Sequence, residues 1–223
     1  MMGSSPGSGT RRRLLVINPN TNAAVTSRVR QAAEACAQAG TGLDVVNPQR
    51  GPFAIESAAD RAAAVPQVLQ LIRQAPAYDG YVLACFDDIA VSEARDLVAA
   101  PVISMAEAGV RVAGSEHARF DVVTTVASAV PTIQALLAAY GMAQRCRVRA
   151  TGIGVSETAA GTRSAEAALE ATVLSSLDAG AEALVLGSGA YAGRKSELSR
   201  LFGVPFIDGL EAAIAFCEAG SGR

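Results

Sequence analysis

Short runs of apolar, often β-branched residues alternate along the chain with longer, alanine-rich segments in which apolar residues recur every three or four positions. The short runs are typical of buried strands and the longer segments of covering helices, so their order predicts an α/β fold with parallel strands. The predicted strands are Leu14–Asn18, Leu43–Asn47, Tyr81–Cys85, Val102–Met105, Phe120–Thr124, Ala150–Val155, Leu184–Leu186 and Phe206–Ile207. The predicted helices are Asn22–Ala39, Ala58–Gln74, Asp88–Ala99, Ala106–Ala113, Ala129–Tyr140, Ser164–Ala179, Ser196–Phe202 and Leu210–Ala219.

The predicted elements occur twice in the same order. Residues 79–85 align with residues 182–188 at a displacement of 103, and residues 100–104 align with residues 204–208 at a displacement of 104. The repetition predicts two pseudo-symmetric lobes, each a mainly parallel four-stranded sheet flanked by helices. We expect the active site in the cleft between the lobes, since ligands of open α/β sheets bind at the carboxyl ends of the strands.

The chain is expected to divide into a leader and these two lobes. Residues 1–10 are rich in glycine and serine, which predicts a flexible leader. We expect the first lobe to comprise residues 11–112 together with residues 208–223, and the second lobe to comprise residues 113–207.

Composition places the chain among globular proteins without a nucleic-acid or membrane partner. Half of its 223 residues are apolar, and 19 Lys and Arg nearly balance 21 Asp and Glu, for a net charge of −2. This balance offers no basic footprint, and no run approaches the roughly 20 apolar residues of a membrane-spanning helix. The apolar stretch after Arg11–Arg13 ends at Ile17, which is too short for a signal peptide. The four cysteines are widely and irregularly spaced, which favours free thiols in a reducing compartment. We therefore expect a cytoplasmic protein.

Cys85 is the foremost candidate for chemistry. It ends a predicted strand, and Phe86, Asp87 and Asp88 follow as a turn into the next predicted helix. Exposed N–H groups and the positive end of a helix lower a thiol pKa from its usual value of about 8.5, so we expect Cys85 to be the most acidic thiol of the chain. Ser188 lies at the equivalent strand end of the second half, in a glycine turn that allows close approach of a ligand.

Polar residues at two further strand ends are candidates for ligand binding. Asn18 follows the first predicted strand, and Thr124 and Thr125 lie at the matching strand end of the second half. The loop of residues 51–57 is equally well interpreted as a plain connection or as a cover over the substrate. The chain has neither a Walker loop, nor a strand-linked GxGxxG, nor metal-ligand spacing, and its single histidine, His117, is not accompanied by a GxSxG elbow. The residues therefore predict no nucleotide cofactor, no metal site and no serine-hydrolase triad.

Several short motifs stand in a fixed order between Leu14 and Cys217. They are Ile17-Asn18-Pro19-Asn20-Thr21, Gly51-Pro52, Ile55-Glu56-Ser57, Ala84-Cys85-Phe86-Asp87-Asp88, Glu107-Ala108, Val122–Thr125, Tyr140-Gly141 and Leu186-Gly187. Together they resemble the aspartate/glutamate racemase superfamily and, within it, the hydantoin and allantoin racemases. The resemblance implies two pseudo-symmetric lobes, no cofactor, and one cysteine from each lobe beside a small-molecule substrate. Cys85 matches the first of these cysteines, whereas Ser188 occupies the position of the second.

The same resemblance implies a racemase of hydantoin-type substrates, either allantoin or 5-substituted hydantoins, that works by cysteine-mediated proton transfer. Cys85 is then the acid and base, and Ser188 stands in the partner position. The groups expected to donate hydrogen bonds to the ring or to a developing oxyanion are Asn18, Thr124, Thr125 and the backbone around Phe86, Asp87 and Gly189. We also expect a homo-oligomer.

Ser188 departs from the family pattern. A hydroxyl is a far weaker acid than a thiol, so near neutral pH it suits proton transfer poorly. Three explanations stay open: an engineered Cys-to-Ser change that traps substrate, a natural one-cysteine enzyme, and a member that moves protons by another route. Two other functions are alternatives, namely a one-cysteine decarboxylase or cis–trans isomerase of a small dicarboxylate, and a non-catalytic small-molecule binding protein.

Overall fold

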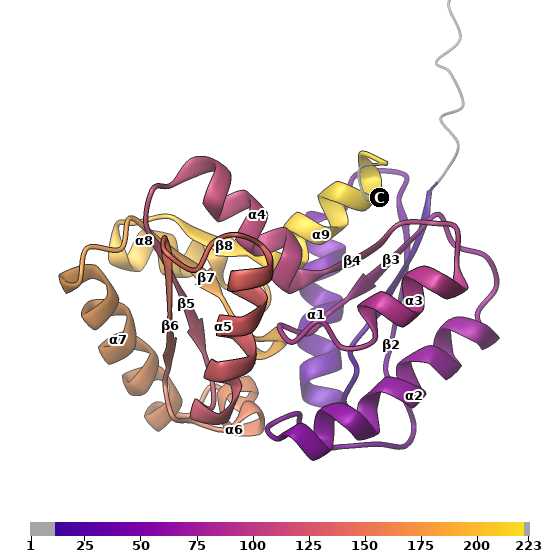
Figure 1. Cartoon of the computed structure of the whole chain (residues 1–223), viewed down its shortest axis with the longest axis horizontal. Coiled ribbons are helices and arrows are strands. Elements are labelled where there is room, and N and C mark those ends of the chain that lie inside the picture. The colour runs from indigo at the N-terminus through magenta and orange to yellow at the C-terminus, as the bar shows by residue number, and fades with distance from the viewer. Residues whose placement is uncertain (1–11, 221–223) are drawn as a thin grey trace, which may run out of the picture.

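The computed structural model describes residues 12–220, and the predicted leader of residues 1–10 lies outside them. Within the described part, the strands form two four-stranded parallel sheets with the same strand order (Figure 1). The first sheet has the order β2-β1-β3-β4 and contains β1 (Arg13–Ile17), β2 (Gly42–Val46), β3 (Gly80–Leu83) and β4 (Val102–Ser104). The second has the order β6-β5-β7-β8 and contains β5 (Phe120–Thr124), β6 (Cys146–Ala150), β7 (Ala183–Leu186) and β8 (Phe206–Asp208). The two-lobed α/β fold expected from the internal repeat is confirmed.

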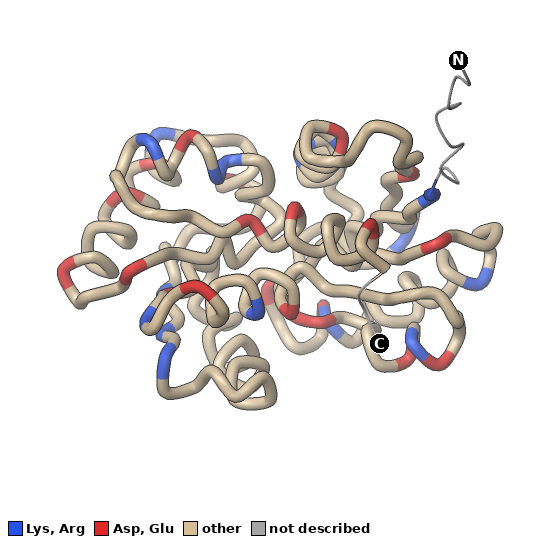
Figure 2. Tube along the Cα trace, turned by 90° about the horizontal axis from the view of Figure 1, so that it is seen from above, with Lys and Arg blue, Asp and Glu red and all other residues tan. Residues whose placement is uncertain are grey.

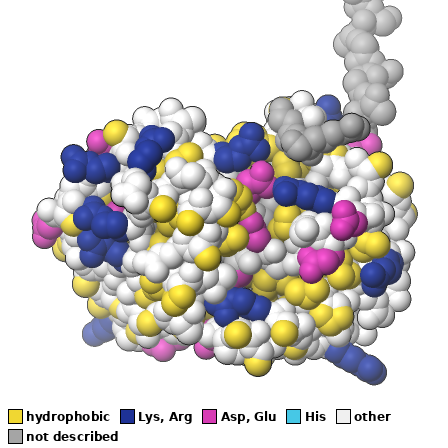
Figure 3. All heavy atoms as spheres, in the orientation of Figure 1, with side chains coloured by type: hydrophobic (Ala, Val, Ile, Leu, Met, Phe, Trp, Pro, Cys, Tyr) yellow, Lys and Arg dark blue, Asp and Glu magenta, His cyan; other side chains and the backbone are white. Residues whose placement is uncertain are grey.

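Helices cover both faces of each sheet, so the central strands are apolar and buried on both sides. The α-helices are α1 (Ala23–Cys36), α2 (Ala58–Gln74), α3 (Val91–Leu97), α4 (Met105–Glu116), α5 (Val130–Ala139), α6 (Val155–Ala160), α7 (Arg163–Asp178), α8 (Lys195–Phe202) and α9 (Gly209–Glu218), with 3-10 turns η1 (Ala127–Ala129) and η2 (Gly189–Tyr191). None of the helices within residues 12–220 has the length and apolar character needed to cross a membrane. Acidic and basic residues are intermixed along both lobes (Figure 2) and over the face shown in Figure 3.

The two lobes exchange a helix. Helix α4 follows the first sheet along the chain, yet it packs against β7 and β8 of the second sheet. Helix α9 follows the second sheet, yet it packs against β3, β4 and α1 of the first lobe. The two helices cross at glycines: a Cβ added to Gly109 would lie 3.1 Å from the Cα of Gly209, and a Cβ at Gly209 would overlap the carbonyl oxygen of Met105. The absence of side chains therefore lets α4 and α9 approach closely, and the exchange ties the lobes together. The division at residues 112 and 208 stays a prediction.

The strand ends of the two sheets are equivalent in detail. The N–H of Ala84 donates to the carbonyl of Ile17 at 2.8 Å, which extends the pairing of β3 with β1 by one residue. The N–H of Gly187 donates to the carbonyl of Val123 at 2.8 Å, which extends the pairing of β7 with β5 in the same way. The next residue in each lobe therefore leaves its sheet at the same point.

Two predicted elements are wrong in position. The strand predicted at Ala150–Val155 is β6, which ends where the prediction begins, and α6 occupies the later residues. The edge strand β6 carries Arg147 and Arg149 between its inward-facing residues, and both arginines pair with the buried Asp121 at 3.1 and 2.7 Å. These charges hid the alternating pattern of the strand. The helix predicted to begin at Asp88 begins only at Val91.

The close helix crossing predicts a selective stability effect. Gly209→Ala should lower the free energy of unfolding by about 2–3 kcal/mol, because the new methyl group collides with backbone that cannot move freely. In the matched control Gly42→Ala, the nearest atoms to the new Cβ lie at 3.6 Å, which is ordinary contact. Urea unfolding of both variants tests this expectation, and equal losses of stability would contradict it.

Candidate active site

One pocket between the lobes contains all of the site residues predicted from the sequence. Those residues are Asn18, Cys85, Phe86, Asp87, Thr124, Thr125, Ser188 and Gly189. The remaining lining residues are Asn20, Val25, Ile55, Ala84, Ala129, Ile133, Val155, Gly187 and Ala190. The lining residues come from the strand ends of both sheets and the loops that follow them. The pocket thus lies where ligands of open α/β sheets bind.

The loops that carry Cys85 and Ser188 touch each other. A Cβ added to Gly189 would lie 3.1 Å from the carbonyl oxygen of Ala84, so the glycine permits a close approach of the two backbones. Cys85 and Ser188 are the chain neighbours of these two residues, and both line the same pocket from opposite lobes. The structure thus brings the two predicted reactive positions together.

The environment of Cys85 raises the pKa of its thiol. Burial raises the pKa of the half-buried Cys85 well above its usual range, and the negative charges of Asp87 and Asp88 raise it further. The N–H of Asp87 and the cation of Arg61 oppose these effects but do not outweigh them. The expectation that Cys85 is the most acidic thiol is therefore wrong. Its physical basis is missing because α3 begins only at Val91, so no helix terminus directly follows the thiol.

Asp87 is held by an ion pair at the edge of the pocket. Arg61 of α2 donates from Nε to Asp87 at 2.9 Å, and both side chains are mostly buried. Burial raises the pKa of Asp87, while the charge and hydrogen bond of Arg61 lower it. Arg61 also donates to the carbonyl of Ser128 in the second lobe at 3.5 Å. Arg61 thus partly offsets the Asp87 charge through the ion pair and bridges the lobes through Ser128.

Asn18 is fully buried, and its amide is committed within the protein. Its Nδ2 group donates to Asn20 Oδ1 at 2.9 Å and to Thr26 Oγ1 at 3.0 Å. Its Oδ1 accepts a long 3.4 Å hydrogen bond from the N–H of Asn20. Both donors that we expected to reach a ligand are therefore in use, and the carbonyl oxygen, which can accept a second hydrogen bond, is the atom left for one.

The hydroxyl groups of the pocket differ in what they can offer a ligand. Thr124 donates to the carbonyl of Gly187 at 3.0 Å, so its oxygen is left as an acceptor. Ser188 accepts from the N–H of Ala190 at 3.2 Å and caps η2, so its hydroxyl hydrogen is left to donate. No hydrogen bond within residues 12–220 engages the hydroxyl of Thr125, which lines the pocket beside Thr124.

The loop of residues 51–57 reaches across to the second lobe. Ile55 lines the pocket, and the Glu56 carboxylate accepts the N–H of Val155, the first residue of α6, at 2.8 Å. The hydroxyl of Ser128 donates to the carbonyl of Glu56. Sequence analysis missed Val155 because it assigned that position to a strand, and it left the covering role of the loop open. The bridge to the opposite lobe favours that covering role.

The fold and pocket together indicate a class of enzyme: two four-stranded parallel sheets of the same strand order, with a pocket at their strand ends, are the architecture of the two-lobed racemases. A family model described as Asp/Glu/Hydantoin racemase matches residues 14–217. A hydantoin racemase of Rhizobium meliloti is 38% identical over 208 residues, which cover 92% of this chain and 86% of that protein. The chain belongs to the Asp/Glu/hydantoin racemase family and is an isomerase.

Solved structures agree with this assignment. An allantoin racemase from Klebsiella pneumoniae superposes with a TM-score of 0.90 at 36% identity, covering 93% of this chain and 86% of that one. An allantoin racemase from Pseudomonas fluorescens gives a TM-score of 0.87 at 30% identity, covering 93% and 89%. Both relatives span the two lobes and the pocket between them.

The charge of Asp87 should control the reactivity of Cys85. Asp87→Asn removes a negative charge and leaves Arg61 nearby, so the thiol pKa should fall and alkylation by iodoacetamide at pH 8 should accelerate, on the order of fivefold. Peptide mapping by mass spectrometry measures the rate at each cysteine. Asp96→Asn, on the exposed face of α3, is the charge-matched control and should leave the rate unchanged. Equal rates in both variants would show that Asp87 does not set the thiol pKa.

Proposed function

We propose that the chain acts on hydantoin-type rings, either allantoin or 5-substituted hydantoins. The observation that carries this proposal is the charge of the pocket: among its described lining residues Asp87 is the one charged side chain, and Arg61 partly offsets its charge. A hydantoin ring is neutral and alternates C=O with N–H groups, which amides, hydroxyls and backbone groups bind directly. A small dicarboxylate needs cationic partners, because burying unpaired charge is costly. The pocket thus favours the racemase over a decarboxylase or isomerase of dicarboxylates.

The proposed reaction begins with removal of the C5 proton. The Cys85 thiolate takes this proton, and the electron pair of the C–H bond moves into a planar, enolate-like ring with its charge on the neighbouring carbonyl oxygen. The hydroxyl of Ser188 and backbone N–H groups around Phe86 and Gly189 stabilise that oxygen. The Cys85 thiol then returns a proton to C5, so the ring leaves with its atoms unchanged and no cofactor takes part.

Ser188 makes the two faces of the stereocentre unequal in this proposal. Its hydroxyl hydrogen is available for a hydrogen bond, but a hydroxyl is too weak an acid to supply a proton near neutral pH. Cys85 therefore serves one face, and proton exchange with solvent outpaces inversion. The expected cytoplasmic location and homo-oligomeric state stay predictions.

Proton NMR in heavy water with single-enantiomer hydantoins and allantoin tests this function. The protein should exchange deuterium into one enantiomer with little inversion, whereas Ser188→Cys should raise racemisation by two orders of magnitude or more, about the effect of a general acid. Cys85→Ser should abolish exchange in both backgrounds, because it removes the proton carrier.

The control for these thiol variants is Cys36→Ser, a half-buried position on α1 that does not line the pocket. It should behave as the unchanged protein. Ligand binding without deuterium uptake would favour the non-catalytic binding protein, and equal racemisation before and after Ser188→Cys would remove position 188 from the mechanism.

The raised thiol pKa predicts an alkaline pH dependence. The fraction of thiolate rises with pH until the pH reaches the thiol pKa, so kcat/KM for exchange should increase about tenfold for each pH unit between about pH 6 and pH 8. Initial exchange rates at low substrate concentration measure this slope. A rate that is flat across that interval would mean that Cys85 is already ionised or is not the base.

A further inference from the structure

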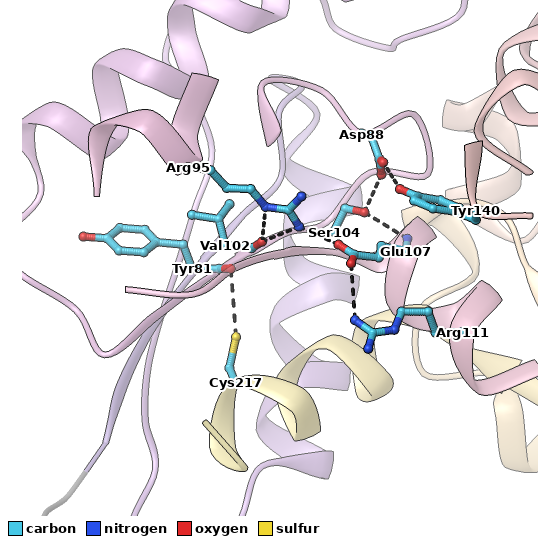
Figure 4. Close-up of polar contacts among 9 residues, drawn as sticks. All are labelled: Tyr81, Asp88, Arg95, Val102, Ser104, Glu107, Arg111, Tyr140 and Cys217. Carbon is cyan, nitrogen blue, oxygen red and sulfur yellow. Dashed lines mark hydrogen bonds and ion pairs between the residues drawn. The ribbon is translucent and has the colours of Figure 1, made fainter. Parts of the chain in front are cut away.

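The loop that leads from Cys85 to α3 is anchored by Asp88. The Asp88 carboxylate accepts hydrogen bonds from the hydroxyls of Ser104 and Tyr140, one at each oxygen (Figure 4). Asp88 itself has a φ of 50°, and Ala90 has a φ of 61°, so two residues of this loop adopt a left-handed conformation that L residues rarely take. The mostly buried carboxylate of Asp88 thus belongs to a residue with a left-handed backbone conformation, three residues after Cys85.

The two partners of Asp88 come from different lobes. Ser104 ends β4 and caps α4, where its hydroxyl oxygen also accepts the N–H of Glu107 at 3.0 Å. Tyr140 follows α5 directly, as its C-cap residue in the second lobe. The carboxylate therefore fixes the Cys85 loop to its own sheet through one hydroxyl and to the opposite lobe through the other.

The second lobe has a corresponding but simpler link. After β7, the N–H of Gly193 donates to the carboxylate of Asp208 at 2.6 Å, and Asp208 ends β8 and caps α9. In both lobes the loop after the third strand is thus bonded to the residue that caps the helix after the fourth. Asp208 makes its link to backbone, whereas Asp88 makes side-chain links and adds the inter-lobe contact. The additional contact to the opposite lobe is therefore found in the loop that carries Cys85 and not in the loop that carries Ser188.

We infer that Asp88 is a positioning residue that, together with Tyr140, holds the Cys85 loop in place against the opposite lobe. The side chain of Asp88 does not line the pocket, so it acts through Cys85 and not on the substrate. The expected loss of kcat rests on the proposed function, whereas the expected change in the reactivity of the Cys85 thiol does not.

Several charged and titratable groups lie around Asp88 and influence its pKa. Asp88 faces Tyr140, the carboxylate of Glu107 on α4 and the guanidinium of Arg95 on α3. Burial raises the pKa of Asp88, and the two donated hydroxyls lower it. Asp87, Asp88 and Arg61 are the charges that act on the Cys85 thiol. Removing the Asp88 charge while keeping a hydrogen-bonding side chain should therefore shift the thiol titration to lower pH.

Four variants separate positioning from mere stability. Tyr140→Phe and Asp88→Ala remove contacts of the anchor and should lower kcat for hydantoin exchange tenfold or more, with KM changed less than threefold, because the thiol is misplaced while the lining residues outside the Cys85 loop are kept. Asp88→Asn retains a side chain that tolerates the left-handed backbone and hydrogen-bonds both hydroxyls. It should rescue kcat to within about threefold and move the pH profile of exchange to lower pH.

The matched control is Tyr78→Phe. Tyr78 donates to Asp44 at 2.7 Å in the first lobe, so this variant removes the same chemical contact away from the pocket and should leave kcat and the pH profile unchanged. A drop in melting temperature alone, with kcat and pH profile kept in Tyr140→Phe, would overturn the inference. Tyr140→Phe serves as the test if Asp88→Ala does not fold.

Alkylation of Cys85 gives a readout that needs no substrate. Its rate across a pH series, read by peptide mapping, should rise at least fivefold in Tyr140→Phe relative to Tyr78→Phe, because the loop no longer holds the thiol buried. Unchanged alkylation in Tyr140→Phe would count against Asp88 as the anchor. Absence of exchange with every hydantoin in the unchanged protein would refute the proposed function alone, and the alkylation series would still decide the role of Asp88.

Discussion

The crossing of α4 and α9 at Gly109 and Gly209 is the contact on which the rest of the molecule depends. Each helix covers the sheet of the lobe that it does not follow, so neither sheet is fully buried without the other half of the chain. The close approach is possible because neither glycine has a side chain at the contact. The relative position of the two sheets is thereby set, and with it the meeting of their strand ends. Everything described for the pocket follows from that meeting.

The equivalence of the lobes ends at the strand termini. The hydrogen bonds of Ala84 and Gly187 repeat the same geometry, and the next residue on each side is the thiol of Cys85 or the hydroxyl of Ser188. From there the two sides differ, since Cys85 is surrounded by carboxylates and anchored through Asp88, whereas Ser188 caps a short turn. A symmetric backbone thus presents two chemically unlike groups to one ligand.

The sequence was sufficient for the architecture because the relevant signals are local. Central strands such as β7 are short apolar runs, and the proline-led fourth strand occurs in both halves. The pocket residues were likewise predictable, because parallel strands place their carboxyl ends at one edge. The acid–base role proposed for Cys85 came from the family resemblance, because the periodicity of apolar residues carries no information on chemistry.

What could not be predicted depends on contacts between distant segments. The arginines of β6 fit a strand only because Asp121 lies opposite them and pairs with them. Helix α6 has six residues, which is too short for a periodic pattern of apolar positions. The pKa of Cys85 is governed by how many atoms surround it, which a strand-to-helix pattern does not report. The position of the 51–57 loop likewise depends on a distant contact, because Glu56 joins it to α6 in the other lobe. The exchanged helices α4 and α9 hold the two lobes together independently of this loop. Opening the pocket at this rim would break the hydrogen bonds of Glu56 to Val155 and Ser128, whereas parting the lobes would also have to separate α4 from α9.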